Sequence, residues 1–68
     1  MIATVQAPSH RAAVRGQFEC MKFGLECEYM EGDILNITAS DISKVQNICA
    51  TIDGSILAIV NRSFAEMS

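Results

Sequence analysis

The chain has 68 residues, half of them hydrophobic, with five basic and eight acidic residues and a formal net charge of −3. This length suits one small domain of marginal stability, and the hydrophobic content argues against disorder. The negative charge gives no broad attraction to nucleic acid or to an anionic membrane. We therefore expect residues 1–68 to form a single domain, with residues 61–68 as a short tail.

The first two elements are predicted to be a strand and a helix. Ala3, Val5 and Ala7 alternate with polar residues, as in a half-buried strand, and Pro8 ends the alternation. Ser9 is a suitable N-cap for the helix that follows. The buried face of this helix would consist of residues at helical spacing, namely Val14, Phe18, Met21 and Leu25, and Gly24 would end it.

Residues 9–24 also fit a strand, because apolar and polar residues alternate over part of this segment. Gly16 favours the strand, since glycine costs about 1 kcal/mol inside a helix. Against the strand, no tight hairpin turn separates this segment from the next, and several of its residues are good helix formers. The helix is the preferred interpretation, and the strand stays open as the alternative.

The second half of the chain is predicted to contain a hairpin, a helix and a strand. Residues 25–38 form the hairpin, with its turn at Glu31-Gly32-Asp33. Thr38 or Ser40 would cap the helix, and Gly54 would end it. Its buried stripe would contain Ile42, Val45, Cys49 and Ile52. Residues 55–60, with the sequence SILAIV, read as a strand that is apolar on both faces.

This order of elements is that of a ferredoxin-like βαββαβ sandwich, in which two helices cover one face of a four-stranded antiparallel sheet. The first and third strands would be central, and the second and fourth would form the edges. The alternative, if residues 9–24 are a strand, is a βββαβ meander with one helix. The ferredoxin-like fold hosts many functions and does not select one.

Two surface features point to protein binding. Four of the eight acidic residues lie on the predicted hairpin, which either protects an edge strand from wrong pairing or matches a basic patch on a partner. These four residues are Glu26, Glu28, Glu31 and Asp33. Because helices cover only one face of the sheet, Leu57 and Ile59, with a residue such as Leu35, would form an apolar patch on the open face. Alternatively the tail, with Phe64 and Met67, covers that patch.

We therefore expect a small, non-enzymatic protein-binding regulator or inhibitor, of the kind encoded by phages and mobile elements, with a larger protein as its partner. The alternative is a homodimeric small-molecule sensor that resembles ACT-type domains and holds its ligand near Pro8–Arg11 at the subunit boundary. The two differ in whether the chain binds another protein or pairs with itself and responds to a metabolite.

Other classes of function are disfavoured by the residues present. His10 is the only histidine and has no recognisable catalytic partners in the sequence, so we expect no enzyme. The spacing of Cys20 and Cys27 is not that of a metal site, so we expect no metal or other cofactor. The strands that bind RNA in domains of this layout carry no aromatic residue here. An odd number of cysteines, no signal peptide and no long apolar run indicate a cytoplasmic protein without membrane contact.

Overall fold

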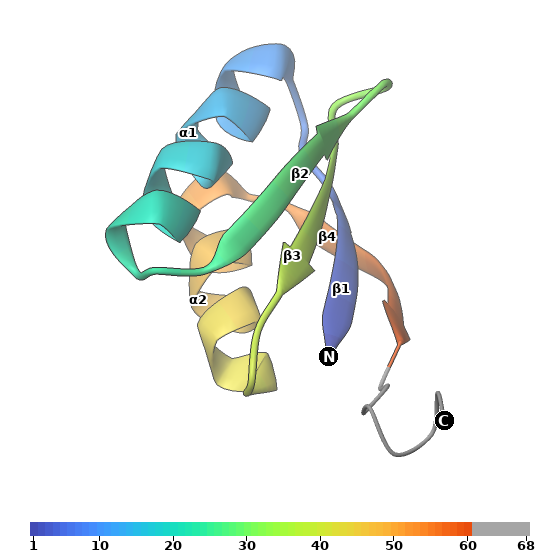
Figure 1. Ribbon diagram of the computed structural model, residues 1–68. Helices are drawn as coiled ribbons and strands as arrows, with labels where there is room; N and C mark the ends of the chain where they lie inside the picture. Colours follow the sequence, from blue (N-terminus) through green and yellow to red (C-terminus); the bar gives the residue numbers. More distant parts are fainter. Residues whose placement is uncertain (61–68) are drawn as a thin grey trace.

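The computed structural model describes residues 1–60 as one α/β sandwich. The elements follow the order βαββαβ: β1 (Ile2–Gln6), α1 (His10–Lys22), β2 (Glu26–Met30), β3 (Ile34–Thr38), α2 (Ile42–Ile52) and β4 (Ser55–Val60). The four strands form one antiparallel sheet in the order β2-β3-β1-β4. Both helices lie on one face of that sheet (Figure 1). The ferredoxin-like prediction is confirmed, and the meander alternative is wrong because residues 10–22 are helical.

The hydrophobic core lies between the two central strands and the helices. Strands β1 and β3 pair with each other over their full length, and their inward side chains are fully buried: Ala3, Val5, Leu35 and Ile37. Helix α2 covers them with the stripe predicted from its spacing, in which Val45, Cys49 and Ile52 are buried together with Ile48, while Ile42 is half-buried. The core is therefore built by the middle of the sheet and not by its edges.

The buried face of α1 differs from the prediction. Its buried residues are Ala13, Gly16 and Cys20, all of them small. Two residues that the spacing places inside lie outside, since Phe18 is 65% exposed and Met21 is 72% exposed. The buried face of the helix is thus displaced by about one residue along the sequence from the face predicted from its large apolar side chains.

The close approach of α1 to the sheet explains this displacement. A Cβ atom added to Gly16 would lie 2.6 Å from Cδ1 of Leu35 and 3.1 Å from Cδ1 of Ile52. Such distances leave no space for a side chain, so the helix turns its small residues inward and its large ones outward. Gly16 lowers the intrinsic helix propensity of this segment, but it allows the contact that holds the segment in place.

The ends of α1 follow the sequence prediction. The Ser9 side chain accepts a hydrogen bond from the backbone N–H of Ala12 at 3.1 Å, which confirms it as the N-cap. Gly24 adopts a left-handed conformation, with φ of +72°, directly after the helix. Its N–H donates to the Met21 carbonyl, and the Leu25 N–H donates to the Cys20 carbonyl. These bonds satisfy carbonyls that the helix end leaves free.

The ends of α2 differ from the prediction. The N-cap is Asp41, not Thr38 or Ser40, and its carboxylate accepts a hydrogen bond from the backbone N–H of Ser43 at 3.0 Å. This bond also lowers the pKa of Asp41. At the other end the residue that caps the helix is Asp53, in a left-handed conformation with φ of 56°, and not Gly54, which we expected to end it.

Gly54 is needed for a different reason, because a Cβ atom there would lie 2.9 Å from Cγ1 of the buried Val5. The chain therefore passes from α2 into β4 in close contact with the central strand β1.

The contact at Gly16 gives a testable prediction. Gly16→Val would force branched carbon atoms into space held by Leu35 and Ile52, and overpacking of this kind costs about 1–3 kcal/mol. We expect urea unfolding to show a loss of that size in the free energy of unfolding. Ala50→Val is the matched control, because Ala50 is an exposed residue of α2 and its change costs at most about 0.7 kcal/mol of helix propensity. Equal losses in both variants would contradict the close contact.

Candidate protein-interaction surface

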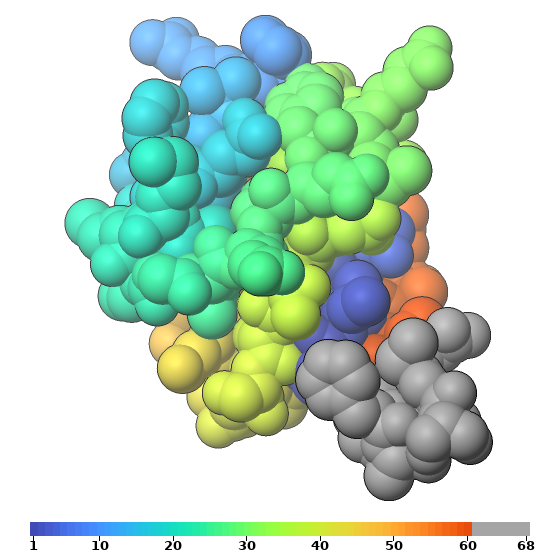
Figure 2. All heavy atoms as spheres, in the orientation of Figure 1, coloured from blue at the N-terminus to red at the C-terminus, as the bar shows by residue number. Residues whose placement is uncertain are grey.

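Strand β4 is an edge strand that exposes most of its apolar side chains. It pairs with β1 on one side, and within residues 1–60 no strand pairs with its other side. All six residues are exposed, among them Ile56, Leu57, Ile59 and Val60. Figure 2 shows β4 (orange) at the surface, on the side of the molecule away from α1. The strand thus presents a free backbone edge together with apolar side chains.

A β-bulge sets the faces on which these side chains lie. Thr4 is paired with Ala58 and the next residue, Val5, with Ile56, so Leu57 is an extra residue in β4. Paired residues share a face of the sheet. Ile59 is paired with Ala3, which is fully buried under the helices, so Ile59 lies on the helix-covered face.

The expectation that Ile59 and Leu35 lie on the open face is therefore wrong. Leu35 is fully buried beneath the helices. The exposure expected at Leu57 and Ile59 is present nevertheless, since they are 56% and 46% exposed. This partial exposure fits the position of β4 at the edge of the sheet, where it is paired with β1. The possible cover by Phe64 and Met67 concerns residues outside the described part of the chain.

Strand β2 is the opposite edge of the sheet and carries acidic side chains. Glu26 and Glu28 are exposed and are paired with Thr38 and Asn36 of β3. Glu31 follows in the exposed turn at the end of the hairpin. Residues of β1, β2 and β3 line a shallow hollow of about 280 Å³ beside the two glutamates. The β2 edge thus combines negative charge with hydrogen-bonding groups.

The structure does not bring the two predicted halves of the binding surface together. Strands β3 and β1 lie between the acidic edge and β4, which corresponds to about 14 Å at the usual strand spacing. The open face between them is polar at its centre, where Thr4 donates a hydrogen bond to Asn36 at 2.8 Å. A single partner can contact both edges only by spanning this face.

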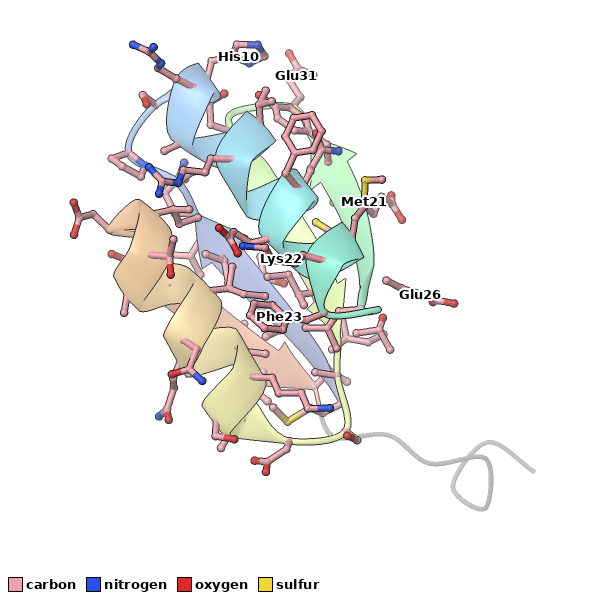
Figure 3. The ribbon with its side chains drawn as sticks, turned by 90° about the vertical axis from the view of Figure 1, so that its left-hand side faces the viewer. His10, Met21, Lys22, Phe23, Glu26 and Glu31 are labelled. Carbon is pink, nitrogen blue, oxygen red and sulfur yellow. The ribbon has the colours of Figure 1, made fainter. Side chains whose placement is uncertain are left out.

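Asp33 is separate from the other three acids. The Tyr29 hydroxyl donates a hydrogen bond to its carboxylate at 2.6 Å, and Nδ1 of His10 lies 2.7 Å from the same hydroxyl. These residues join the hairpin turn to the start of α1, and Figure 3 shows His10 and Glu31 at this end of the molecule. The hydrogen bond to Asp33 raises the pKa of Tyr29. Asp33 therefore has a structural partner within the chain.

The sequence did not indicate this cluster. Tyr29 and Asp33 are four residues apart across a turn, and they meet because Asp33 adopts a left-handed conformation, with φ of 60°. The backbone of the turn is fixed as well, because the carbonyl of Asp33 accepts a hydrogen bond from the Ala7 N–H at 2.9 Å.

The cysteines are free thiols inside the sandwich. Cys20 and Cys49 are buried, and Cys27 of β2 is partly exposed. A hydrogen bond between the Cys20 and Cys27 side chains, together with burial, raises the pKa of Cys20, while the same bond lowers that of Cys27. Within residues 1–60, no group of three or more His, Cys, Asp or Glu side chains is placed to hold a metal ion.

A groove lies between the start of α1 and the end of α2, in the region where a ligand was expected. It has a volume of about 480 Å³ and is lined by residues of both helices and by Pro8 and Ser9. Arg11, Arg15 and Asp53 supply its charged groups, and Phe18 forms part of its wall. The groove belongs to the helix layer of one chain and not to an edge of the sheet.

Because the comparisons with known proteins found no match, the function is argued from the fold and from the surface residues. No family model, curated protein or solved structure matches the chain. Neither helix of the described residues is long and apolar enough to cross a membrane.

The Tyr29 cluster predicts a specific pH dependence. The pKa of Tyr29 is higher in the folded protein than in the unfolded chain, where it is about 10. The hydrogen bond to Asp33 therefore contributes its full stabilisation below the unfolded pKa, and this contribution is lost as the pH rises through the folded pKa. Asp33→Asn removes the charge, so we expect the pKa of Tyr29 to fall toward its ordinary value.

Tyrosinate absorbance measures this pKa directly, because the chain has one tyrosine and no tryptophan. His10→Ala is the control and should leave the titration nearly unchanged, since Asp33 provides the main cause of the raised pKa. The same titration curve in Asp33→Asn and in the parent protein would contradict the Tyr29–Asp33 hydrogen bond.

The thiols predict an order of chemical reactivity. We expect brief alkylation of the native protein to modify Cys27 first, because it is partly exposed and its pKa is lowered. Cys20 and Cys49 are buried and have raised pKa values, so they should react only on unfolding. Mass spectrometry of the alkylated peptides measures the order, with Cys27→Ser as the control that removes the fast phase. Early modification of Cys49 would contradict its burial in the core between α2 and the sheet.

Proposed function

We propose that this protein is a non-enzymatic protein-binding domain, a regulator or inhibitor whose binding element is the β4 edge. The observation that supports it most is that β4 exposes Leu57 and Ile59 next to a backbone edge with which no strand of residues 1–60 pairs. Such an edge binds an extended strand through backbone hydrogen bonds, while side-chain contacts provide specificity. An exposed apolar edge strand that carries no charge and binds no partner would promote aggregation.

The acidic β2 edge supports a second contact in this proposal. Glu26, Glu28 and Glu31 form a negative edge that suits a basic patch on a larger protein. Exposed charges of this kind act mainly on the rate of association and on specificity. The β4 edge would provide most of the affinity, because it is the edge that removes apolar surface from water.

The proposal is tested by affinity capture from a lysate of the native host with Leu57→Asp as bait. Leu57 is an extra residue in the bulge and is more than half exposed, so an aspartate there should leave the fold intact. We expect a partner retained by the parent protein to be lost from this variant, because a charge at the edge opposes strand addition.

Phe18→Asp is the matched control, since Phe18 is an exposed apolar residue of α1 on the helix layer. It should retain the partner. Circular dichroism of both variants shows whether the fold is kept. A partner retained by Leu57→Asp and lost from Phe18→Asp would place binding on the helices and overturn the proposal.

A small-molecule sensor is the second candidate, and the groove of about 480 Å³ near Pro8–Arg11 favours it. Arg11 and Arg15 would bind an anionic metabolite there. A melting temperature that rises with one metabolite, and that no longer rises in Arg15→Ala, would support this function over protein binding.

A further inference from the structure

We propose that the strand bound at β4 is the β4 strand of a second copy of this chain, so that two copies form one continuous eight-stranded sheet. The inference rests on the proposed function, because it identifies the partner of the same edge. It follows from the contrast between the two edges of the sheet and from the faces on which the side chains of β4 lie.

The two edges differ in charge. Exposed Glu26 and Glu28 lie along β2, so two β2 edges brought together would place like charges opposite each other. Strand β4 has the sequence SILAIV and carries no charged side chain. Of the two edges in residues 1–60, β4 is thus the one that can pair with itself without electrostatic cost.

Edge pairing through β4 also separates the acidic groups. In the sheet order β2-β3-β1-β4, joining two β4 strands leaves the two β2 strands at the outer ends of the doubled sheet. The chain carries a formal charge of −3, and this arrangement keeps its acidic edges as far apart as the sheet allows. The two acidic edges then remain free to contact another protein.

The side chains of β4 suit a two-fold arrangement. The bulge places Ile56 and Ile59 on the same, helix-covered face, since they are paired with the buried Val5 and Ala3. An antiparallel pair related by a two-fold axis perpendicular to the sheet keeps that face common to both copies. The partly exposed isoleucines of the two copies would then lie on the same face, side by side across the junction of the two β4 strands.

Leu57 and Ala58 are the middle residues of β4 and lie nearest to such an axis. A charge introduced at Leu57 would therefore lie diagonally next to the same charge in the other copy. An interface built from two six-residue strands is small, and we expect a reversible dimer with a dissociation constant of roughly micromolar order.

The experiment measures the mass of the full chain by sedimentation equilibrium and native mass spectrometry, from about 1 μM to about 1 mM. We expect the parent protein to pass from monomer to dimer over this range. Leu57→Lys and Leu57→Glu should each weaken the dimer at least about tenfold, because like charges meet at the axis. Mixing the two variants should restore a dimer that contains one copy of each.

Phe18→Lys is the matched control, because it adds the same charge at an exposed apolar residue of α1. It should dimerise like the parent protein, and circular dichroism shows that each variant is folded. Loss of the dimer in Phe18→Lys together with a normal dimer in Leu57→Lys would overturn the proposal. A failure of the Lys and Glu variants to form a mixed dimer would do the same.

Two further outcomes separate this inference from the proposed function. If the chain is monomeric up to about 1 mM, the inference that β4 pairs with a second copy is wrong. The proposed function still stands in that case if the Leu57→Asp variant loses a captured partner. A chain shortened to end at Val60 that dimerises, while the full chain does not, shows that residues 61–68 occupy β4 and also overturns the proposal.

Discussion

The fold depends on one contact, the insertion of the Ile52 side chain between two glycines. Cδ1 of Ile52 lies 3.1 Å from where a Cβ atom of Gly16 would be and 3.3 Å from the equivalent position at Gly54. One side chain of α2 thus lies against α1 at Gly16 and against the turn at Gly54 that leads into β4, and Leu35 of β3 borders the same position of Gly16. Any side chain at either glycine would have to displace buried atoms, and close-packed interiors transmit such displacements to their neighbours.

This contact also determines which apolar residues remain outside. Because α1 approaches the sheet through Ala13, Gly16 and Cys20, its larger side chains project from the helix layer, and Phe18 and Met21 are among the most exposed apolar residues described. The core is consequently narrow and is centred on β1 and β3. Within residues 1–60, strand β4 pairs with another strand on one side only, and its apolar residues stay partly exposed.

Periodicity predicted most of the elements and their order, because each has a regular pattern and a recognisable end. It left residues 9–24 open between a helix and a strand, since the spacing of their apolar residues fits both. It failed at the buried face of α1, where the pattern was read from large side chains although burial there is determined by the space beside Leu35. The acidic cluster could be predicted because its members are close in sequence. The separation of Asp33 from it could not, since this depends on the conformation of one turn residue and on its hydrogen bond with Tyr29.

The candidate surface was predicted in composition but not in geometry, and the bulge in β4 explains the difference. Strict alternation puts Leu57 and Ile59 on one face, whereas the extra residue places Ile59 with Ile56 opposite buried positions of β1. These two isoleucines thus lie on the helix-covered face and are still 36% and 46% exposed. Association that buries β4 removes this apolar surface from water and stabilises the folded state in proportion to the logarithm of partner concentration. Binding at this edge and stability of the fold are therefore linked through the same apolar side chains.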